Sequence, residues 1–396
     1  MPQLLQFMKQ HDSSDLYLVV GKAPAYKISG AVKPAGKNIL TAEHTEDLAR
    51  SCMADHEWEE FLEKREQNLA LEYPEIGRFR LNAYYQKKCI AMVIRKIETE
   101  ILTLDDLKLP EILKNVSMTT RGLVLVVGAT GSGKSTSLAA MIDHRNRNEA
   151  GHIITIEDPI EFVHEHKQCV ISQREVGVDT ESFKAALKNT LRQAPTVILL
   201  GEIRDEETME YAINFAETGH LCLATLHSNN ANQALERILN FFPPERQHQV
   251  YLQLSLNLKA IISQRLVRTS NGGRAAAIEI LLGNSRIREL IKQGDVEAIK
   301  EAMDKGTNEG MQTFDQAIFT LYREGRITLE EALKNADSVT DLKLKIKLAE
   351  ASESANGETT LSELDSESEG GHGLSLHDDE TELEEPKEEE KQPEAA

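Results

Sequence analysis

The sequence predicts an α/β protein whose central part is a mostly parallel sheet with a phosphate-binding loop. Two observations support this fold class. The apolar, mostly β-branched run Leu123–Val127 leads into Gly128-x4-Gly133-Lys134-Ser135, and a segment of helical character follows. Three further apolar runs alternate with helical segments, as parallel strands covered on both faces require. These runs are His152–Ile156, Thr196–Leu200 and His220–Thr225.

The glycine-rich stretch matches the pattern of loops that bind nucleoside triphosphates. Glycines let backbone N–H groups approach the phosphates, and the N-terminus of the following helix favours their negative charge. In this pattern Lys134 reaches the β- and γ-phosphates, and the Ser135 hydroxyl binds Mg²⁺. An ordinary glycine-rich turn is the alternative. The predicted nucleotide-binding residues are Gly128, Ala129, Thr130, Gly131, Ser132, Gly133, Lys134, Ser135 and Thr136.

Charge and cysteine content narrow the class of protein. The chain has 396 residues and a formal net charge of −20, of which −14 falls within residues 351–396. The remainder is nearly balanced, which argues against DNA or RNA as the main partner. The four cysteines are scattered, so we expect reduced thiols in a cytoplasmic protein rather than disulfides or zinc. We find no signal peptide and no apolar run of membrane-spanning length, and therefore expect no direct membrane insertion.

Residues 1–98 are expected to form a separate α/β domain, with one helix packed on an antiparallel sheet. The pattern predicts the helix over residues 41–64. Arg78, Arg80 and Arg95 take alternating positions on the sheet, where a solvated face is the simpler interpretation. The predicted strands of this domain cover residues 16–20, 69–73, 78–85 and 90–96.

The rest of the chain divides into four further regions. Residues 99–118 are expected to form a linker, and residues 119–283 the domain with the phosphate loop. Residues 284–350 contain four helical segments. Residues 351–396 contain no aromatic residue and too little apolar surface to fold, which predicts a disordered acidic tail. The end of the central domain is predicted to contain a helix over Gln249–Val267 and a last strand over Ala275–Leu282.

Acidic residues and histidines flank the predicted strands of the central domain. Three carboxylates fall within Glu157–Glu161, just after one strand, and Glu202 follows the next. Ligands bind at the C-terminal ends of strands in such sheets, so these carboxylates are placed to bind Mg²⁺ or to activate water. His220 and His227 lie at the two ends of a third strand. Ordinary surface polarity would explain the polar residues of any one of these three stretches. The occurrence of all three beside a phosphate loop favours a hydrolytic site.

Several motifs, in this order, resemble those of the secretion-superfamily ATPases. The similarity covers roughly residues 10–348, and the nearest branch is the type IV pilus retraction ATPases of the PilT/PilU family. Three features are more similar to the PilU side of that branch: Asn257–Leu266, Gly310–Gln316 and the long acidic tail. The motifs are Gly128–Thr136, Ile153–His164, Gln173–Gly177, Leu200–Thr208 and Glu217–His227.

The resemblance implies a RecA-like core, a PAS-like N-terminal domain, and an enzyme that hydrolyses ATP with Mg²⁺. Glu161 corresponds to the family's catalytic glutamate, which is expected to orient and deprotonate the attacking water. Glu202 corresponds to the atypical Walker B glutamate. Asp158 falls in the family's acidic box, and the implied metal-binding set is Ser135, Glu202 and Asp158.

The resemblance also implies a hexameric ring with shared sites. His220 and His227 match a histidine box that is thought to sense nucleotide and couple subunits. Arg78, Arg80 and Arg95 match arginines that one subunit lends to its neighbour's nucleotide, which replaces the solvated-face interpretation. The implied function is a motor for pilus retraction and twitching motility, cytoplasmic and peripheral at the inner membrane. Its implied partners are a homo-hexamer, a PilT-type paralogue and an inner-membrane pilus platform protein.

Departures from the family pattern open an alternative. The family's Arg-x-Asp-Pro-Asp becomes Arg192–Thr196 with Ala194 and Thr196 in place of the acids, and we expect this loss to lie near the site. The Ala-Ile-Arg segment linked to retraction reads Arg286–Arg288, with only its last two residues kept. The alternative is a nucleotide-binding accessory subunit that docks on a catalytic paralogue, its own turnover being dispensable. A small-molecule kinase is a third, weaker alternative.

Overall fold

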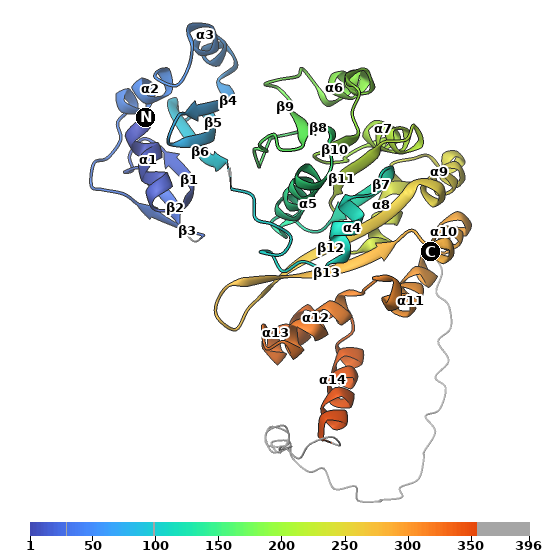
Figure 1. The fold of residues 1–396 in the computed structure, drawn as a ribbon. Coiled ribbons are helices and arrows are strands. Elements are labelled where there is room, and N and C mark those ends of the chain that lie inside the picture. Colours follow the sequence, from blue (N-terminus) through green and yellow to red (C-terminus); the bar gives the residue numbers. More distant parts are fainter. Residues whose placement is uncertain (29, 98–99, 355–396) are drawn as a thin grey trace, which may run out of the picture. The chain divides into compact units, whose positions relative to one another are not determined.

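The computed structural model describes residues 1–28, 30–97 and 100–354, and Figure 1 shows its elements along the chain. Two sheets are present, one of six strands near the N-terminus and one of seven strands in the centre of the sequence. The predicted disordered tail lies outside the described residues, except for its first four positions, which end helix α14 (Val339–Ser354). A search of the described residues for helices of membrane-spanning length and hydropathy finds none.

The N-terminal sheet has the strand order β3-β2-β1-β6-β5-β4, and its neighbouring strands pair antiparallel. The sheet and its helices enclose a separate hydrophobic cluster that includes Leu16, Phe61 and Leu81. The four predicted strands are present as β1, β4, β5 and β6, whereas α1, β2 and β3 were not predicted. The elements are α1 (Pro2–Gln10), β1 (Ser13–Leu18), β2 (Ala25–Ile28), β3 (Ala31–Pro34), α2 (Ala42–Arg50), α3 (Asp55–Lys64), β4 (Glu66–Tyr73), β5 (Gly77–Gln86) and β6 (Cys89–Ile97).

The single helix predicted over residues 41–64 is two helices, α2 and α3. Each has its own N-terminal cap. The Thr41 hydroxyl accepts the N–H of His44 at 3.2 Å, and the Glu57 carboxylate accepts the N–H of Ala54 at 2.7 Å. These bonds satisfy backbone groups that a helix start leaves without intrahelical partners. The prediction missed the break because residues 41–64 contain no glycine or proline to mark it.

The central sheet has the strand order β13-β12-β7-β11-β10-β8-β9. Its strands pair parallel, except that β13 pairs antiparallel with β12. The α/β prediction with a mostly parallel sheet is therefore confirmed. The strands are β7 (Gly122–Val127), β8 (Gly151–Glu157), β9 (Cys169–Glu175), β10 (Val197–Leu200), β11 (Leu221–Leu226), β12 (Leu258–Arg268) and β13 (Arg274–Leu282).

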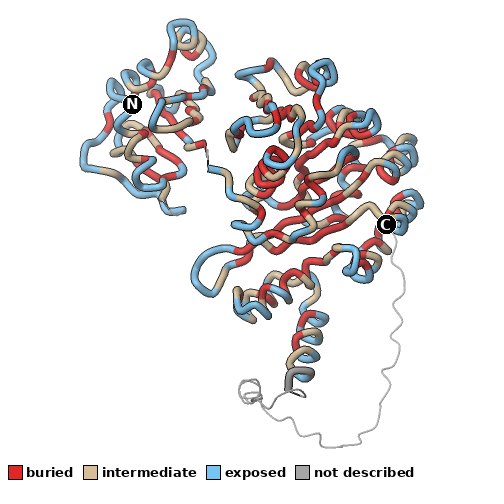
Figure 2. The backbone as a smooth tube through the Cα atoms, viewed as in Figure 1, coloured by how far each residue is buried: buried red, intermediate tan, exposed pale blue. Residues whose placement is uncertain are grey.

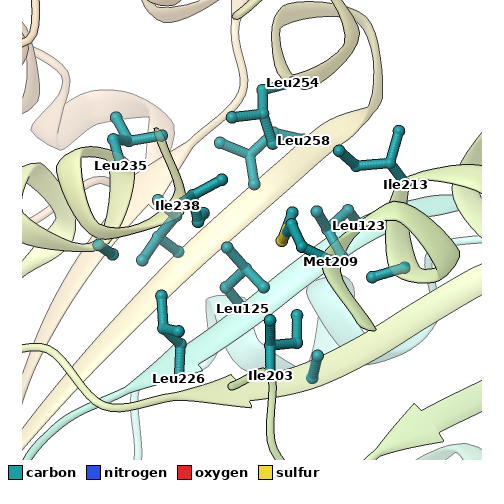
Figure 3. Packing of buried hydrophobic residues seen from close by; sticks show 14 of the residues in the cluster. Leu123, Leu125, Ile203, Met209, Ile213, Leu226, Leu235, Ile238, Leu254 and Leu258 are labelled. Carbon is teal, nitrogen blue, oxygen red and sulfur yellow. The ribbon is translucent and has the colours of Figure 1, made fainter. Parts of the chain in front are cut away.

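Helices cover both faces of this sheet, and a hydrophobic cluster lies on each face. Strand β7 contributes side chains to both clusters. Leu123, Leu125 and Val127 belong to one hydrophobic cluster, whereas Val124 and Val126 belong to the other, as the two-residue period of a strand requires. Figure 2 shows buried residues along these strands, and Figure 3 shows part of the first cluster. The first cluster is covered by α7 (Glu206–Glu217), α8 (Ala231–Asn240) and α9 (Pro244–Asn257), and the second by α4 (Ile112–Ser117) and α5 (Lys134–Asn148).

The prediction of a helix across Gln249–Val267 is wrong in its second half. Helix α9 ends at Asn257, and β12 begins at Leu258 and lies between β7 and β13. The run Ala260–Ile262 is fully buried, and short apolar runs of this kind fit a buried strand or a buried helix equally well. The segment is a strand because it pairs with two neighbouring strands. The local sequence does not reveal this pairing.

The helices predicted after residue 284 are present, and α14 was not predicted. Ile287, Leu290 and Ile299 from the first two of them join the first hydrophobic cluster of the central sheet. Arg265 of β12 lies 3.8 Å from the ring centre of Phe314 and forms an ion pair of 2.6 Å with Asp337, which ties this region to the sheet. The remaining elements are α6 (Phe183–Thr190), α10 (Ser285–Gln293), α11 (Glu297–Lys305), α12 (Phe314–Arg323) and α13 (Leu329–Asn335), with short 3₁₀ helices at Leu191–Gln193 and Thr307–Glu309.

Candidate active site

The predicted phosphate loop connects β7 to α5, the strand–loop–helix setting that the motif requires. Helix α5 begins at Lys134, so its first N–H groups face the loop. The Lys134 ammonium is buried and donates hydrogen bonds to the carbonyl oxygens of Gly128 at 2.9 Å and Ala129 at 3.0 Å. The lysine therefore lies across the loop, and its charge is held where phosphates would bind.

Two glycines of the loop are required by close packing. A Cβ atom on Gly128 would lie 2.5 Å from both the Gln264 carbonyl oxygen and the Ser132 hydroxyl. A Cβ atom on Gly133 would lie 2.7 Å from the Gln264 amide nitrogen. Both residues also have positive φ, of 154° and 88°, which side-chain-bearing residues rarely adopt. The loop can take this shape only with glycine at these positions.

The predicted carboxylates gather at the C-terminal ends of β8 and β10. These strands pair in register, with Ile156 opposite Leu200, so the residues that follow them lie at the same edge of the sheet. Glu202 forms an ion pair of 2.7 Å with Arg204 and lies 3.2 Å from the Nε2 atom of His227. The guanidinium of Arg204 also reaches Asp158 at 3.4 Å.

A cavity of about 470 Å³ joins the phosphate loop to these charged residues. It brings together three of the seven residues that the sequence proposed for catalysis, all three proposed for metal binding and six of the nine proposed for nucleotide binding. Its lining includes Thr130, Gly131, Gly133, Lys134, Ser135 and Thr136 of the loop region, the acidic residues Glu157, Asp158, Glu161 and Glu202, and the basic residues His164, Arg204, His227 and Arg274. Gly128, Ala129 and Ser132 complete the loop beside it.

Burial changes the proton affinity of several of these groups. It lowers the pKa of Lys134, an effect that the charges of Glu202 and Glu161 oppose. Burial raises the pKa of Glu157 to about 7, against the opposing hydrogen bonds from Thr155 and Gln173. Burial also lowers the pKa of His164 to about 4, so this imidazole is neutral at neutral pH. A bound polyphosphate would compensate the solvation that Lys134 has lost.

The residues fit a magnesium-bound nucleoside triphosphate. Hydroxyl and carboxylate oxygens, as on Ser135, Asp158 and Glu202, are the donors that Mg²⁺ prefers. The Ser132 hydroxyl, within the loop, is buried and has no hydrogen-bond partner among the described residues. A phosphate oxygen would satisfy such a group. Lys134 and the N-terminus of α5 supply the positive potential that the phosphates need.

His220, which the sequence assigned to the site, is not brought to this cavity. It precedes β11 and bonds the Thr218 hydroxyl at 3.1 Å, whereas His227 follows the same strand. The strand of six residues separates them by about 20 Å at the usual rise per residue. The phosphate loop and the carboxylates both lie at the C-terminal edge of the parallel sheet. Of these two histidines, a single chain therefore brings only His227 to the site.

The three arginines of the N-terminal sheet share one face. Arg78 and Arg80 are two residues apart on β5, and Arg80 lies directly opposite Arg95 on β6. Arg95 forms an ion pair of 2.8 Å with the buried Asp15 and remains 66% exposed, so this cation is anchored and still accessible. None of the three contributes to the lining of the cavity, whose residues lie between 130 and 274.

The two lost acids do not lie near the site, contrary to expectation. Ala194 and Thr196 precede β10, whereas Glu202 follows it, so they occupy opposite ends of the strand. Thr196 donates its hydroxyl to the His152 carbonyl at 3.1 Å, at the start of β8. Ala194 has a φ of 49°, a left-handed conformation that Asp adopts more readily than Ala. The substitutions therefore change a turn at the far edge of the sheet.

Sequence reasoning assigns no role to His164, Arg204 or Arg274, which line the cavity, or to Gln264, which packs against the loop. Arg204 falls within the motif Leu200–Thr208, where a cation two residues after Glu202 is a signal that it could pair with a neighbouring acid. Gln264 was hidden because its segment was predicted as helix. It accepts the Ser137 hydroxyl at 2.7 Å and packs against the phosphate loop.

The chain is similar to known proteins in both sequence and fold. Residues 63–334 match the family described as Type II/IV secretion system protein. The chain is 55% identical over 352 residues to the type IV pilus ATPase PilU of Pseudomonas aeruginosa, with 89% of this chain and 92% of that protein covered. It is 42% identical to the retraction ATPase PilT of the same organism, with 84% and 97% covered. A crystal structure of the pilus retraction motor PilT with bound ADP superposes with a TM-score of 0.80 at 39% identity and covers 86% of this chain and 98% of that one.

Proposed function

Because this chain belongs to the type II/IV secretion system protein family, and within it to the PilT/PilU group of type IV pilus ATPases, we propose that it is a Mg-ATP-hydrolysing hexameric motor for pilus retraction and twitching motility. The observation that carries the proposal is the cavity in which the phosphate loop meets Glu161 and Glu202. A phosphate loop by itself binds nucleotide. A carboxylate beside it adds the means to activate water.

The chain's own groups divide the chemistry between them. Lys134 and the N–H groups at the start of α5 hold the β- and γ-phosphates. Glu161 orients the attacking water and accepts its proton, the role of a general base. Ser135, Glu202 and Asp158 would hold Mg²⁺, which when bound neutralises the charge that develops on the transferred phosphoryl group. His227, in contact with Glu202, positions that carboxylate.

The remaining proposals concern the assembly. In a homo-hexamer, Arg78, Arg80 and Arg95 of one subunit would reach the nucleotide of the next, and their shared face suits this role. His220 would act between subunits rather than at its own chain's nucleotide. A PilT-type paralogue and the inner-membrane pilus platform protein are the proposed partners, and the proposed location is the cytoplasmic side of the inner membrane.

The proposed domain division follows the sequence boundaries. A PAS-like domain covers 1–98, a linker 99–118, a RecA-like ATPase domain 119–283 and a helical region 284–350, followed by an acidic tail from 351. The accessory-subunit alternative rests on the loss of acids at Ala194 and Thr196 and on the PilU-like features of the C-terminal part of the chain. Since Ala194 and Thr196 lie at the other end of β10, hydrolysis by this chain is the better supported proposal.

The test is the ATPase rate of the purified full chain, alone and mixed with the paralogue. Lys134→Ala is expected to abolish nucleotide binding. Glu161→Gln is expected to keep nucleotide binding but to lower turnover by about 10²- to 10⁴-fold, the usual contribution of a general base. A wild-type rate equal to that of Lys134→Ala in both settings would refute the proposal. Twitching that survives Glu161→Gln beside a wild-type paralogue would instead favour the accessory role.

A further inference from the structure

We propose that Gln264 is a positioning residue that fixes the phosphate loop at both of its ends from the neighbouring strand β12. The inference rests on the proposed nucleotide site and adds a residue that the sequence pattern did not assign to it. The loop between Gly128 and Gly133 must keep its N–H groups convergent to bind phosphate. Gln264 touches the loop at these two glycines through different atoms.

The first contact comes from the backbone of β12. This strand pairs parallel with β7, and Ser263 lies opposite Val127, the last residue of β7. The next residue along, Gln264, therefore lies beside the first residue of the loop. Its carbonyl oxygen would be 2.5 Å from a Cβ atom on Gly128, so the strand packs directly on the glycine backbone.

The second contact comes from the Gln264 side chain. Its Oε1 atom accepts the hydroxyl of Ser137 on α5 at 2.7 Å, and both residues are buried, with exposures of 3% and 2%. A hydroxyl that donates to one end of the amide leaves the NH₂ end to point the other way. That nitrogen lies 2.7 Å from the position of a Cβ atom on Gly133, at the start of α5. In this arrangement the NH₂ end of the amide faces the loop.

These contacts hold the loop before any nucleotide arrives. Lys134 and Ser135 follow Gly133 directly, so a shift of this end of the loop moves both of them. Ordering the loop in advance removes a conformational cost from binding, and affinity rises accordingly. An apolar side chain at position 264 would free the loop end and leave the Ser137 hydroxyl buried without its partner.

The experiment measures the affinity of the full chain for Mg-ADP, with a fluorescent ADP analogue as probe, together with kcat and KM for ATP. The variants are Gln264→Leu, Ser137→Ala and the double variant. The matched control is Gln312→Leu. The Gln312 side chain also donates a hydrogen bond to this sheet, to the Ile278 carbonyl at 2.7 Å, but it lies away from the loop. Circular dichroism reports whether each variant is folded.

The expected result is a loss of ADP affinity of roughly tenfold in Gln264→Leu, about the effect of one buried hydrogen bond. Ser137→Ala should lose less, and the double variant should be no weaker than Gln264→Leu, because both changes remove the same contact. The rise in KM should exceed the fall in kcat. Affinity within twofold of wild type in Gln264→Leu, or an equal loss in Gln312→Leu, would overturn the inference.

Two outcomes separate this inference from the proposed function. If the wild-type chain binds no Mg-ADP, the proposed nucleotide site is wrong, and the role of Gln264 falls with it. If the wild-type chain binds Mg-ADP and Gln264→Leu binds it equally well, only the inference fails. Should Gln264→Leu not fold, Ser137→Ala decides: unchanged affinity there contradicts the inference, and a several-fold loss supports it.

Discussion

The guanidinium of Arg204 bridges two carboxylates, with its Nε atom 2.7 Å from Glu202 and its Nη1 atom 3.4 Å from Asp158. Both acids belong to the proposed metal-binding set. The arginine supplies positive charge between them, and it is more than half exposed, so solvent screens the attraction. Arg204 therefore offsets the repulsion of two acids at the place where Mg²⁺ is proposed to bind.

Arg204→Gln is expected to lower the Mg²⁺ concentration needed for half-maximal ADP binding by about two- to fivefold, the scale of an exposed ion pair. The two carboxylates would then attract the metal ion without competition. A Mg²⁺ titration of fluorescent ADP binding measures the change. Arg246→Gln is the matched control, because Arg246 also pairs with two acids, Glu206 at 2.7 Å and Glu210 at 2.5 Å, outside the cavity lining. A higher Mg²⁺ requirement in Arg204→Gln would contradict the prediction.

Glu157 should make stability depend on pH. Its pKa is about 7 in the folded chain, against an ordinary value of 4.5. The folded state therefore binds the proton more tightly, and the stabilisation present below about 4.5 is lost as the pH rises through about 7. The free energy of unfolding of the wild type should fall over this range relative to that of Glu157→Gln. Urea unfolding at several pH values measures both, and parallel curves for the two proteins would contradict the prediction.

Gly128→Ala should destabilise the chain more than Gly131→Ala. The new Cβ at position 128 would meet two oxygens at 2.5 Å, and such overpacking costs about 1–3 kcal/mol. At position 131 no other described residue beyond the two chain neighbours has an atom within 4 Å of the new Cβ, so the positive φ of 77° is what opposes the alanine. Chemical denaturation without nucleotide gives the two losses. Equal losses of stability in the two variants would mean that the close contact of Gly128 with Gln264 and Ser132 adds nothing to the destabilisation.

Restoring the family's acids, with Ala194→Asp and Thr196→Asp together, should change kcat by less than about twofold, which corresponds to a few tenths of a kcal/mol in barrier. Both positions precede β10, and neither belongs to the cavity lining. Steady-state phosphate release measures the rate. A tenfold gain in the double variant would show that this turn does control turnover.

Local features of the sequence could be predicted, and pairings between distant segments could not. The phosphate loop is encoded within nine consecutive residues, and Glu202 is located by the end of its strand. Strand β12 depends on β7, more than a hundred residues earlier in the sequence, so its apolar run alone could not separate strand from helix. Gln264 was missed for that reason. The motif match assigns His220 to the site, and within one chain β11 places it at the opposite end of that strand from His227.

The consequence of β12 lies in two adjacent residues that face opposite sides of the strand. Gln264 holds the phosphate loop, and Arg265 holds Phe314 and Asp337 in the region after the sheet. One peptide bond joins the two attachments. The phosphate loop and the C-terminal helices therefore contact neighbouring residues of the same strand. We expect a displacement of either one to be transmitted through β12 to the other.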